Sequence, residues 1–190
     1  ILLGMIGGFI ILRQRSILGR KTGHESKIYQ GFAEKEFNIP KNEVKPVKQN
    51  LDILEGKDKK EFLRGAEIAY ESILTSFASG DLIKLKNLLS SKMFSNFSEA
   101  IKSRNKEGIK SEFTFIGVKE SSLENYQKIS DNLFATVKFV AEVISVKKDK
   151  DNKIIEGNPD KIKFVTDSWK FTKNIKQKGP NWYLSEIISK

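Results

Sequence analysis

The last quarter of the chain constrains the fold most strongly. Val165, Trp169 and Phe171 share one parity of an extended segment, whereas polar residues occupy most of the other positions. Because successive side chains of a strand point to opposite faces, this alternation predicts a half-buried strand. A Gly-Pro-Asn turn at 179–181 then reverses the chain, and a second strand resumes at Trp182. A sheet face with two tryptophans must be covered by apolar side chains from the rest of the chain.

Three helices are expected ahead of these strands. The first runs over 58–79 and ends at Gly80, a residue type that commonly follows a helix. The second carries the leucines of 82–89 and is capped by Asp81, and the third runs over 91–104. The first helix has an apolar stripe at steps of three and four residues, formed by Phe62, Ala66, Ala69, Tyr70, Ile73 and Phe77.

From Lys110 the apolar period changes to two, which predicts strands. We expect four: 113–118, 132–146, a strand beginning near 165, and one beginning at 182. The second strand has one fully apolar face, formed by Leu133, Ala135, Val137, Phe139, Ala141 and Val143. Helices followed by a strand meander indicate an α+β fold, in which N-terminal helices pack on a curved four-stranded antiparallel sheet. Such a sheet would wrap the helices into a cone with an apolar mouth.

The composition leaves little catalytic chemistry. The chain has no cysteine and a single histidine, His24, and it lacks a Gly-rich phosphate loop and metal-ligand spacing. No metal or cofactor is therefore expected. Asp167 is the one acid in an otherwise apolar strand row. It could act as a base with a raised pKa, pair with a lysine, or mark a bulge at the rim of the sheet.

The N-terminus predicts a membrane anchor. Residues 1–12 are uniformly apolar, which is typical of part of a transmembrane helix, with a signal-peptide core or a buried helix as alternatives. Basic residues follow in place of a small-residue cleavage site: Arg13, Arg15, Arg20 and Lys21. They would contact anionic lipid and keep the downstream domain in the cytoplasm. We expect residues 13–57 to be a basic juxtamembrane segment and flexible linker, and 58–190 to be the folded domain.

The sequence also resembles a known family. The run 62–90 (FLRGAEIAYESILTSFASGDLIKLKNLLS) is similar to the opening helices of one domain type. This is the C-terminal domain of the mitochondrial inner-membrane translocase's peripheral tether, subunit forty-four, and of its single-pass alphaproteobacterial relatives. The segments 165–172 (VTDSWKFT) and 180–184 (PNWYL) resemble its closing strands, and 15–25 (RSILGRKTGHE) resembles the bacterial juxtamembrane segment. Lys173 departs from the family, in which an arginine is common at this position.

The resemblance implies an α+β domain of the nuclear-transport-factor-2-like kind with a large apolar pocket. In the mitochondrial protein this domain is associated with anionic-lipid contact and with tethering a chaperone-driven import motor. The chaperone-recruiting region of that protein has no counterpart here, so the motor role is not expected. The residues expected to line the pocket are apolar or aromatic: Phe62, Tyr70, Phe77, Phe97, Val137, Phe139, Trp169 and Phe171.

Three functional classes remain open. The favoured one is a single-pass adaptor at the bacterial inner membrane, whose pocketed cytoplasmic domain binds a protein segment or a lipid. Its partner would be a protein client or a component of protein translocation or membrane-protein quality control. One alternative is a ribosome- or RNA-associated protein of the same domain type, although the charge of the domain is too diffuse for a nucleic-acid partner to be expected. The other is a small-molecule enzyme using the cone cavity, for which Asp167 is the visible acid.

Overall fold

The computed structural model describes residues 54–179 and 181–188. The apolar segment 1–12, the basic cluster at Arg13, Arg15, Arg20 and Lys21, and most of the linker lie outside this part of the chain. Among the described residues, none of the helices combines the length and the apolar character that a bilayer crossing requires.

Within the described residues, three helices precede the sheet. They are α2 (Gly56–Ser79), α3 (Leu82–Leu88) and α4 (Ser91–Lys106). After α2 the chain turns at Gly80 with φ of 78°, a conformation that a residue with a Cβ atom rarely adopts. The expected cap at Asp81 is confirmed, because its carboxylate accepts the backbone N–H of Lys84 at 3.0 Å.

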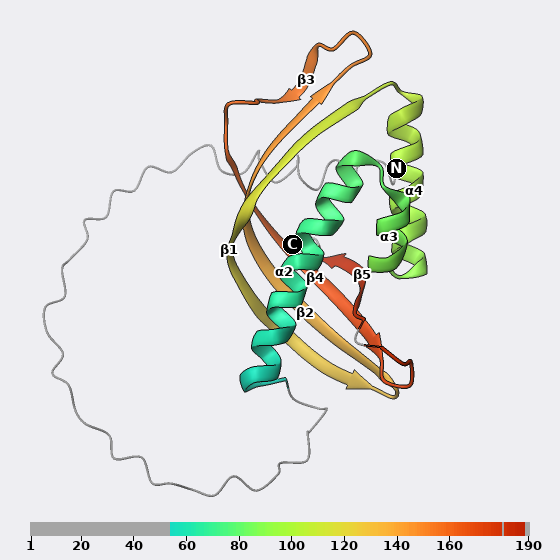
Figure 1. Ribbon diagram of the computed structural model, residues 1–190, viewed down its shortest axis with the longest axis vertical. Helices are drawn as coiled ribbons and strands as arrows, with labels where there is room; N and C mark the ends of the chain where they lie inside the picture. The colour runs from blue at the N-terminus through green and yellow to red at the C-terminus, as the bar shows by residue number, and fades with distance from the viewer. Residues whose placement is uncertain (1–53, 180, 189–190) are drawn as a thin grey trace, which may run out of the picture.

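The five strands form one antiparallel sheet. They are β1 (Lys110–Ile129), β2 (Asn132–Lys148), β3 (Ile154–Gly157), β4 (Lys163–Asn174) and β5 (Tyr183–Ile188). The order across the sheet is β1-β2-β4-β5, and β3 pairs with the end of β2. Figure 1 shows the long strands bowed around α2, with α3 and α4 on the same side of the sheet. The predicted α+β fold with helices packed on a curved antiparallel sheet is confirmed.

The core lies between α2 and the concave face of the sheet. The face of β2 that the sequence marks as apolar is almost completely buried, from Leu133 at 5% exposure to Val143 at 1%. Ala66, Tyr70 and Ile73 from α2 pack against it, and Phe97 and Ile101 from α4 complete the same cluster. The apolar side chains that recur every three or four residues on α2 thus pack against those that alternate along β2. This packing of a helix on a sheet face produces the two-layer fold.

Two features differ from the sequence expectation. β1 continues to Ile129, well beyond the expected end at 118, and its pairing with β2 shifts register at three places. Each shift interrupts the alternation of inward and outward side chains, so the second half of this strand has no readable period. The short strand β3 was not expected, and it makes the sheet five-stranded instead of four-stranded. Ile154 and Ile155 are exposed, and Glu156 and Gly157 are half-buried, so the strand has no buried apolar face that the sequence could show.

Gly157 shows how β3 is attached. Its φ is 89°, and a Cβ atom at this position would lie 2.0 Å from the carbonyl oxygen of Ser145 on β2. Only glycine fits such a close approach of two backbones. The lack of a side chain at Gly157 therefore allows the backbone of β3 to pair closely with β2. Burial of apolar side chains contributes little to this pairing.

Candidate functional site

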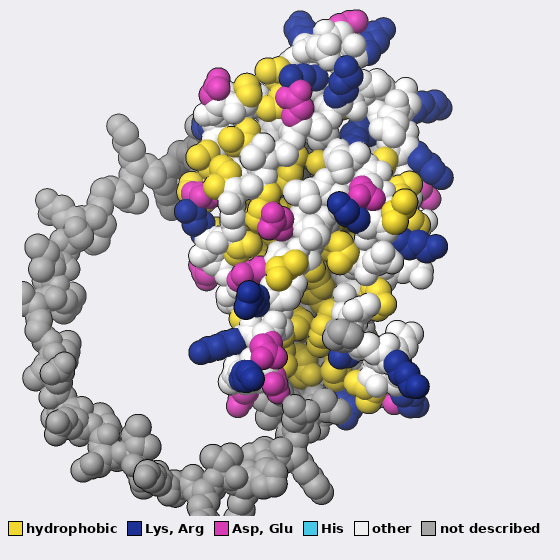
Figure 2. All heavy atoms as spheres, in the orientation of Figure 1, with side chains coloured by type: hydrophobic (Ala, Val, Ile, Leu, Met, Phe, Trp, Pro, Cys, Tyr) yellow, Lys and Arg dark blue, Asp and Glu magenta, His cyan; other side chains and the backbone are white. Residues whose placement is uncertain are grey.

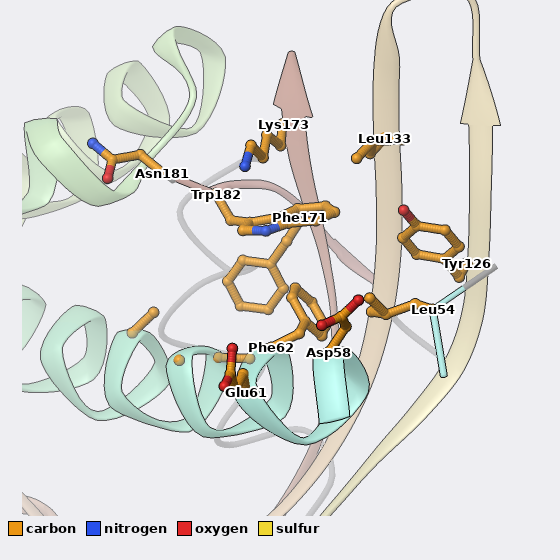
Figure 3. Close-up of a pocket in the computed structure, with 13 residues that line it drawn as sticks. Leu54, Asp58, Glu61, Phe62, Tyr126, Leu133, Phe171, Lys173, Asn181 and Trp182 are labelled. Atoms are coloured by element: carbon orange, nitrogen blue, oxygen red, sulfur yellow. The ribbon is translucent and has the colours of Figure 1, made fainter. Parts of the chain in front are cut away.

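An open pocket of about 480 Å³ lies between the first half of α2 and one end of the sheet. Figure 3 shows its walls: α2 on one side and β1, β2 and β4 on the other, with the segment before β5 closing the top. The lining residues come from all of these elements: Leu54, Asp58, Glu61, Phe62, Gly65, Ala66, Ala69, Tyr126, Leu133, Phe171, Lys173, Asn181 and Trp182.

Three aromatic rings form the apolar part of the pocket. Phe62 packs edge-on against Trp182 with ring centroids 4.8 Å apart, and against Phe171 at 6.4 Å. Figure 3 shows these three side chains grouped between α2 and β4. Phe171 is buried and belongs to the core, whereas Phe62 and Trp182 are only partly buried. The pocket is therefore the open end of the core, where apolar side chains meet solvent, and it suits an apolar ligand group.

The polar residues of the pocket are unevenly distributed. Asp58 and Glu61 belong to the α2 wall, and Lys173 belongs to β4 across the pocket. Glu61 also forms an exposed ion pair with Lys57 at 3.6 Å. Two carboxylates and one ammonium group can orient a bound molecule. Within the described residues, no group of His, Cys, Asp and Glu side chains could hold a metal ion.

The structure separates the eight predicted pocket residues into three groups. Phe62 and Phe171 line the pocket. Phe77 is half-buried at the other end of α2 and packs on Phe97, with ring centroids 5.0 Å apart. The remaining residues are 2% exposed or less and fill the core: Tyr70, Phe97, Val137, Phe139 and Trp169. A ligand role for the eight residues stays a prediction, but the structure does not bring them together in one cavity.

Sequence reasoning missed most of the polar wall. In the sequence, Asp58 and Glu61 are charged residues near a helix start, where solvent-exposed side chains are common. Lys173 and Tyr126 are far from them in the sequence, so no local pattern links the four residues. Trp182 was the one available signal, because an apolar residue directly after a Gly-Pro-Asn turn is placed at the end of a sheet. The sequence does not predict which end of α2 Trp182 contacts, because periodicity gives the buried face of the helix but not its direction across the sheet.

Asp167 has a partner that the sequence did not suggest. The hydroxyl of Tyr70 on α2 donates a hydrogen bond of 2.6 Å to the carboxylate of Asp167 on β4. Asp167 is 6% exposed, and Tyr70 has no exposed surface. The register of β2 with β4 is continuous at Phe139 opposite Asp167, so the alternative in which Asp167 marks a bulge is wrong for this pairing.

This pair is buried inside the core, and neither residue lines the pocket. Tyr70 is stacked on Phe139 with ring centroids 4.4 Å apart and lies 4.5 Å from the ring of Trp169. Burial raises the pKa of the Tyr70 hydroxyl well above its ordinary value, and the charge of Asp167 raises it further. The hydroxyl therefore remains a proton donor. The enzyme alternative would require Asp167 and a partner such as a tyrosine to line the cavity, and neither Asp167 nor Tyr70 lines it.

Comparison with known proteins places the chain in a family. A family model described as "Tim44-like domain" matches residues 48–189. The chain belongs to this family. The match spans the whole folded domain, from ahead of α2 to the end of β5, so the resemblance in the opening helices and closing strands is confirmed.

Two further proteins are similar to this Tim44-like chain. It is 23% identical over 168 residues to the probable mitochondrial import inner membrane translocase subunit tin-44 of Caenorhabditis elegans. The match covers 85% of this chain but 40% of that protein. The crystal structure of the intermembrane space region of the chloroplast protein ARC6 aligns with a TM-score of 0.46 and 12% identity. That alignment covers 67% of this chain and 97% of the ARC6 chain.

The buried Tyr70–Asp167 pair generates a stability prediction. Tyr70→Phe should lower the free energy of unfolding by about 2–3 kcal/mol, because the carboxylate of Asp167 stays buried without this donor. The double variant Tyr70→Phe/Asp167→Leu removes both polar groups and should recover at least half of that loss. Urea unfolding followed by tryptophan fluorescence measures both. Equal destabilisation of the single and double variants would show that the hydrogen bond is not the cause.

The raised pKa of Tyr70 generates a pH prediction. The folded state keeps the phenolic proton at pH values where an unfolded tyrosine, with a pKa of about 10, loses it. This contribution to stability is complete below about pH 10 and should fall by about 1.4 kcal/mol per pH unit above it. Unfolding curves measured on both sides of about pH 10 should show this slope in the natural chain and a shallower one in Tyr70→Phe. Parallel slopes would contradict the prediction.

Proposed function

We propose that this chain is a membrane-bound adaptor whose Tim44-like domain holds an apolar segment of a partner protein in its pocket. The observation that carries the proposal is the open pocket with Phe62, Phe171 and Trp182 on its walls. Family membership supports an adaptor, since the matching relative is named as a subunit of an import translocase. The chain spans 40% of that relative, so a role in protein translocation or in membrane-protein quality control is part of the proposal.

The charges around the pocket favour a peptide over an anionic lipid as the occupant. Asp58 and Glu61 repel a phosphate head group at the α2 wall, and Lys173 faces them from β4. An apolar side chain flanked by a lysine or arginine satisfies both features: the apolar group enters between the aromatic rings, and the cation lies near the carboxylates. The acyl chain of a lipid would use the same apolar wall but would leave its anionic end beside Asp58 and Glu61.

The pocket supports binding better than catalysis. Its walls carry two carboxylates, a lysine, a tyrosine and an asparagine on an apolar base, without the buried Tyr70–Asp167 pair. A catalytic acid or base must reach the substrate, and Asp167 is 6% exposed, is hydrogen-bonded to Tyr70 and does not line the pocket. We therefore propose that Asp167 has a structural role and that the domain is not an enzyme.

We also propose that residues 1–12 anchor the chain in the bacterial inner membrane. In this arrangement Arg13, Arg15, Arg20 and Lys21 contact anionic head groups, and residues 58–190 lie in the cytoplasm. The support is the apolar run followed by basic residues, together with the relation to an inner-membrane translocase subunit. An anchored chain would keep the pocket close to clients that enter or leave the membrane.

A pair of neighbouring substitutions tests the pocket. Ala69 lines the pocket from α2, whereas the preceding residue, Ile68, is 60% exposed and lies outside the pocket. Ala69→Glu should reduce client binding about tenfold or more, because it places a charge against the aromatic rings. Ile68→Glu introduces the same charge and should leave binding unchanged. A photo-cross-linking amino acid at the position of Trp182 in the full chain reports client contact in cells.

Thermal unfolding of both variants is the control, since a Glu in a helix costs little unless it disturbs the core. Equal cross-linking in Ala69→Glu and the natural chain would contradict the pocket proposal.

Asp167→Asn separates binding from catalysis. If this variant folds and keeps its cross-links but loses the cellular function, catalysis becomes the better explanation.

The membrane part of the proposal has its own measurement. Extraction of native membranes with alkaline carbonate releases proteins held by charge alone and retains those with an inserted apolar segment. The full chain should remain in the membrane pellet, and a variant with three aspartates within residues 1–12 should be released, since each costs several kcal/mol to insert. Release of the natural chain would contradict the anchor.

A further inference from the structure

The chain enters the folded domain at the pocket. Leu54, the first described residue, lines the pocket together with Asp58 at the start of α2. Figure 3 shows the side chain of Leu54 beside that of Asp58. Between them, Gly56 has a φ of 58°, a left-handed conformation that residues with a Cβ atom rarely adopt. The chain thus turns sharply ahead of α2, and the residues that precede Leu54 join the domain at the pocket itself.

The pocket leaves apolar surface open to solvent. Phe62 and Trp182 line it and are only partly buried. Gly65 and Ala69 on α2 are small and leave space in front of these rings. Figure 2 shows hydrophobic side chains in the hollow beside the first half of α2, with charged side chains around the start of that helix. Because water disfavours contact with such a surface, an apolar group that is always nearby would cover it.

The sequence ahead of α2 carries groups of this kind. Residues 44–53, which we call the entry segment, read Val-Lys-Pro-Val-Lys-Gln-Asn-Leu-Asp-Ile. A lysine lies on each side of Val47, and Asp58 and Glu61 belong to the α2 wall of the pocket. The segment therefore has the chemistry that the pocket favours, an apolar side chain flanked by cations. The Tim44-like match begins at residue 48, so part of the entry segment belongs to the matched domain.

The entry segment is long enough to reach the whole pocket. Val47 lies seven positions ahead of Leu54, and seven residues span at most roughly 25 Å. The α2 wall from Asp58 to Ala69 has eleven helical steps, which correspond to about 16 Å. Val47 can therefore contact any part of this wall while the chain stays connected through Leu54.

We propose that the entry segment occupies the pocket of its own chain when no client is bound, with Val47 against the aromatic rings and the flanking lysines near Asp58 and Glu61. A client must then displace this segment. The inference rests on the proposed function, because it assigns a competitor to the same pocket. A second copy fits less well, since its entry segment is present at a far lower concentration than the one attached to the pocket. An acyl chain would leave its anionic end beside the two carboxylates.

Self-occupancy sets how tightly a client must bind. A short tether gives an effective concentration on the order of 1 mM at the pocket. With a dissociation constant of about 0.3 mM, the entry segment would fill roughly three quarters of the pockets and raise the apparent dissociation constant of a client about fourfold. Clients with several apolar contacts would displace it, and sequences that match the pocket poorly would not.

Disulfide formation in the full chain tests the proposal, because the chain has no cysteine of its own. Val47→Cys is combined with Gly65→Cys in the pocket, where an added Cβ atom meets nothing within 4 Å. The matched control combines Val47→Cys with Ile68→Cys, because Ile68 is exposed, uncharged and outside the pocket. Native membranes are oxidised mildly, and free thiols are counted by a maleimide gel shift. The 47–65 disulfide should form about tenfold faster than the 47–68 disulfide.

A substitution at Val47 tests the competition with a client. Val47→Asp removes the apolar group and adds an acid that Asp58 and Glu61 repel. The emptied pocket should give about threefold more client cross-linking at position 182 than the natural chain. Asn42→Asp adds the same charge ahead of the entry segment and should leave client cross-linking unchanged.

Three results would overturn the proposal. Equal disulfide rates with 65 and 68 would leave the pocket to an acyl chain or to water. Disulfide-linked dimers that increase with protein concentration would report a second copy. Client cross-links that are measurable but equal in Val47→Asp and Asn42→Asp would exclude competition.

Failure of the proposed function has a different signature. A fast 47–65 disulfide without any client cross-links at 182 would support self-occupancy and contradict the proposed client. Client cross-links that Ala69→Glu abolishes, together with equal disulfide rates, would contradict self-occupancy alone.

Discussion

The structure depends on the packing of α2 into the concave face of the sheet, and Tyr70 is the centre of that contact. Its ring is stacked on Phe139 of β2 and lies close to Phe115 of β1 and Trp169 of β4. Its hydroxyl binds Asp167 on β4. One side chain of the helix thus contacts three strands. A buried carboxylate is costly unless hydrogen-bond donors compensate it, and the Tyr70 hydroxyl is one such donor, so this bond favours the position of α2 that supplies it.

The pocket follows from the same packing. The helix is in tight contact with the sheet around Tyr70 and Ile73, and towards its N-terminus small residues replace large ones. Gly65, Ala66 and Ala69 line the cavity there, opposite Phe171 and Trp182. These small side chains on α2 leave space in front of the aromatic rings of the pocket. The pocket is therefore the part of the space between helix and sheet that the core does not fill.

The two ends of the sheet differ in their chemistry. One end presents an open apolar pocket with carboxylates beside it, and the other presents exposed isoleucines among lysines. The long strands β1 and β2 join these ends. The pocket end shares Ala66 and Phe171 with the core around Tyr70, whereas no side chain of 147–164 is buried.

The sequence by itself determined the elements of the core. The stripe of α2, the cap at Asp81 and the buried face of β2 are local patterns, because helix and strand periods place side chains without reference to the rest of the chain. Tertiary structure alone decided the partner of Asp167 and the lining of the pocket, since Tyr70 and Asp167 are 97 positions apart in sequence. It also decided the extent of β1, because register shifts interrupt the period of that strand. The existence of β3 was likewise decided by tertiary structure, since Gly157 only permits the close approach to β2 and produces no apolar pattern. Periodicity reports which face of an element is buried. The partner that buries it depends on how the elements meet in three dimensions.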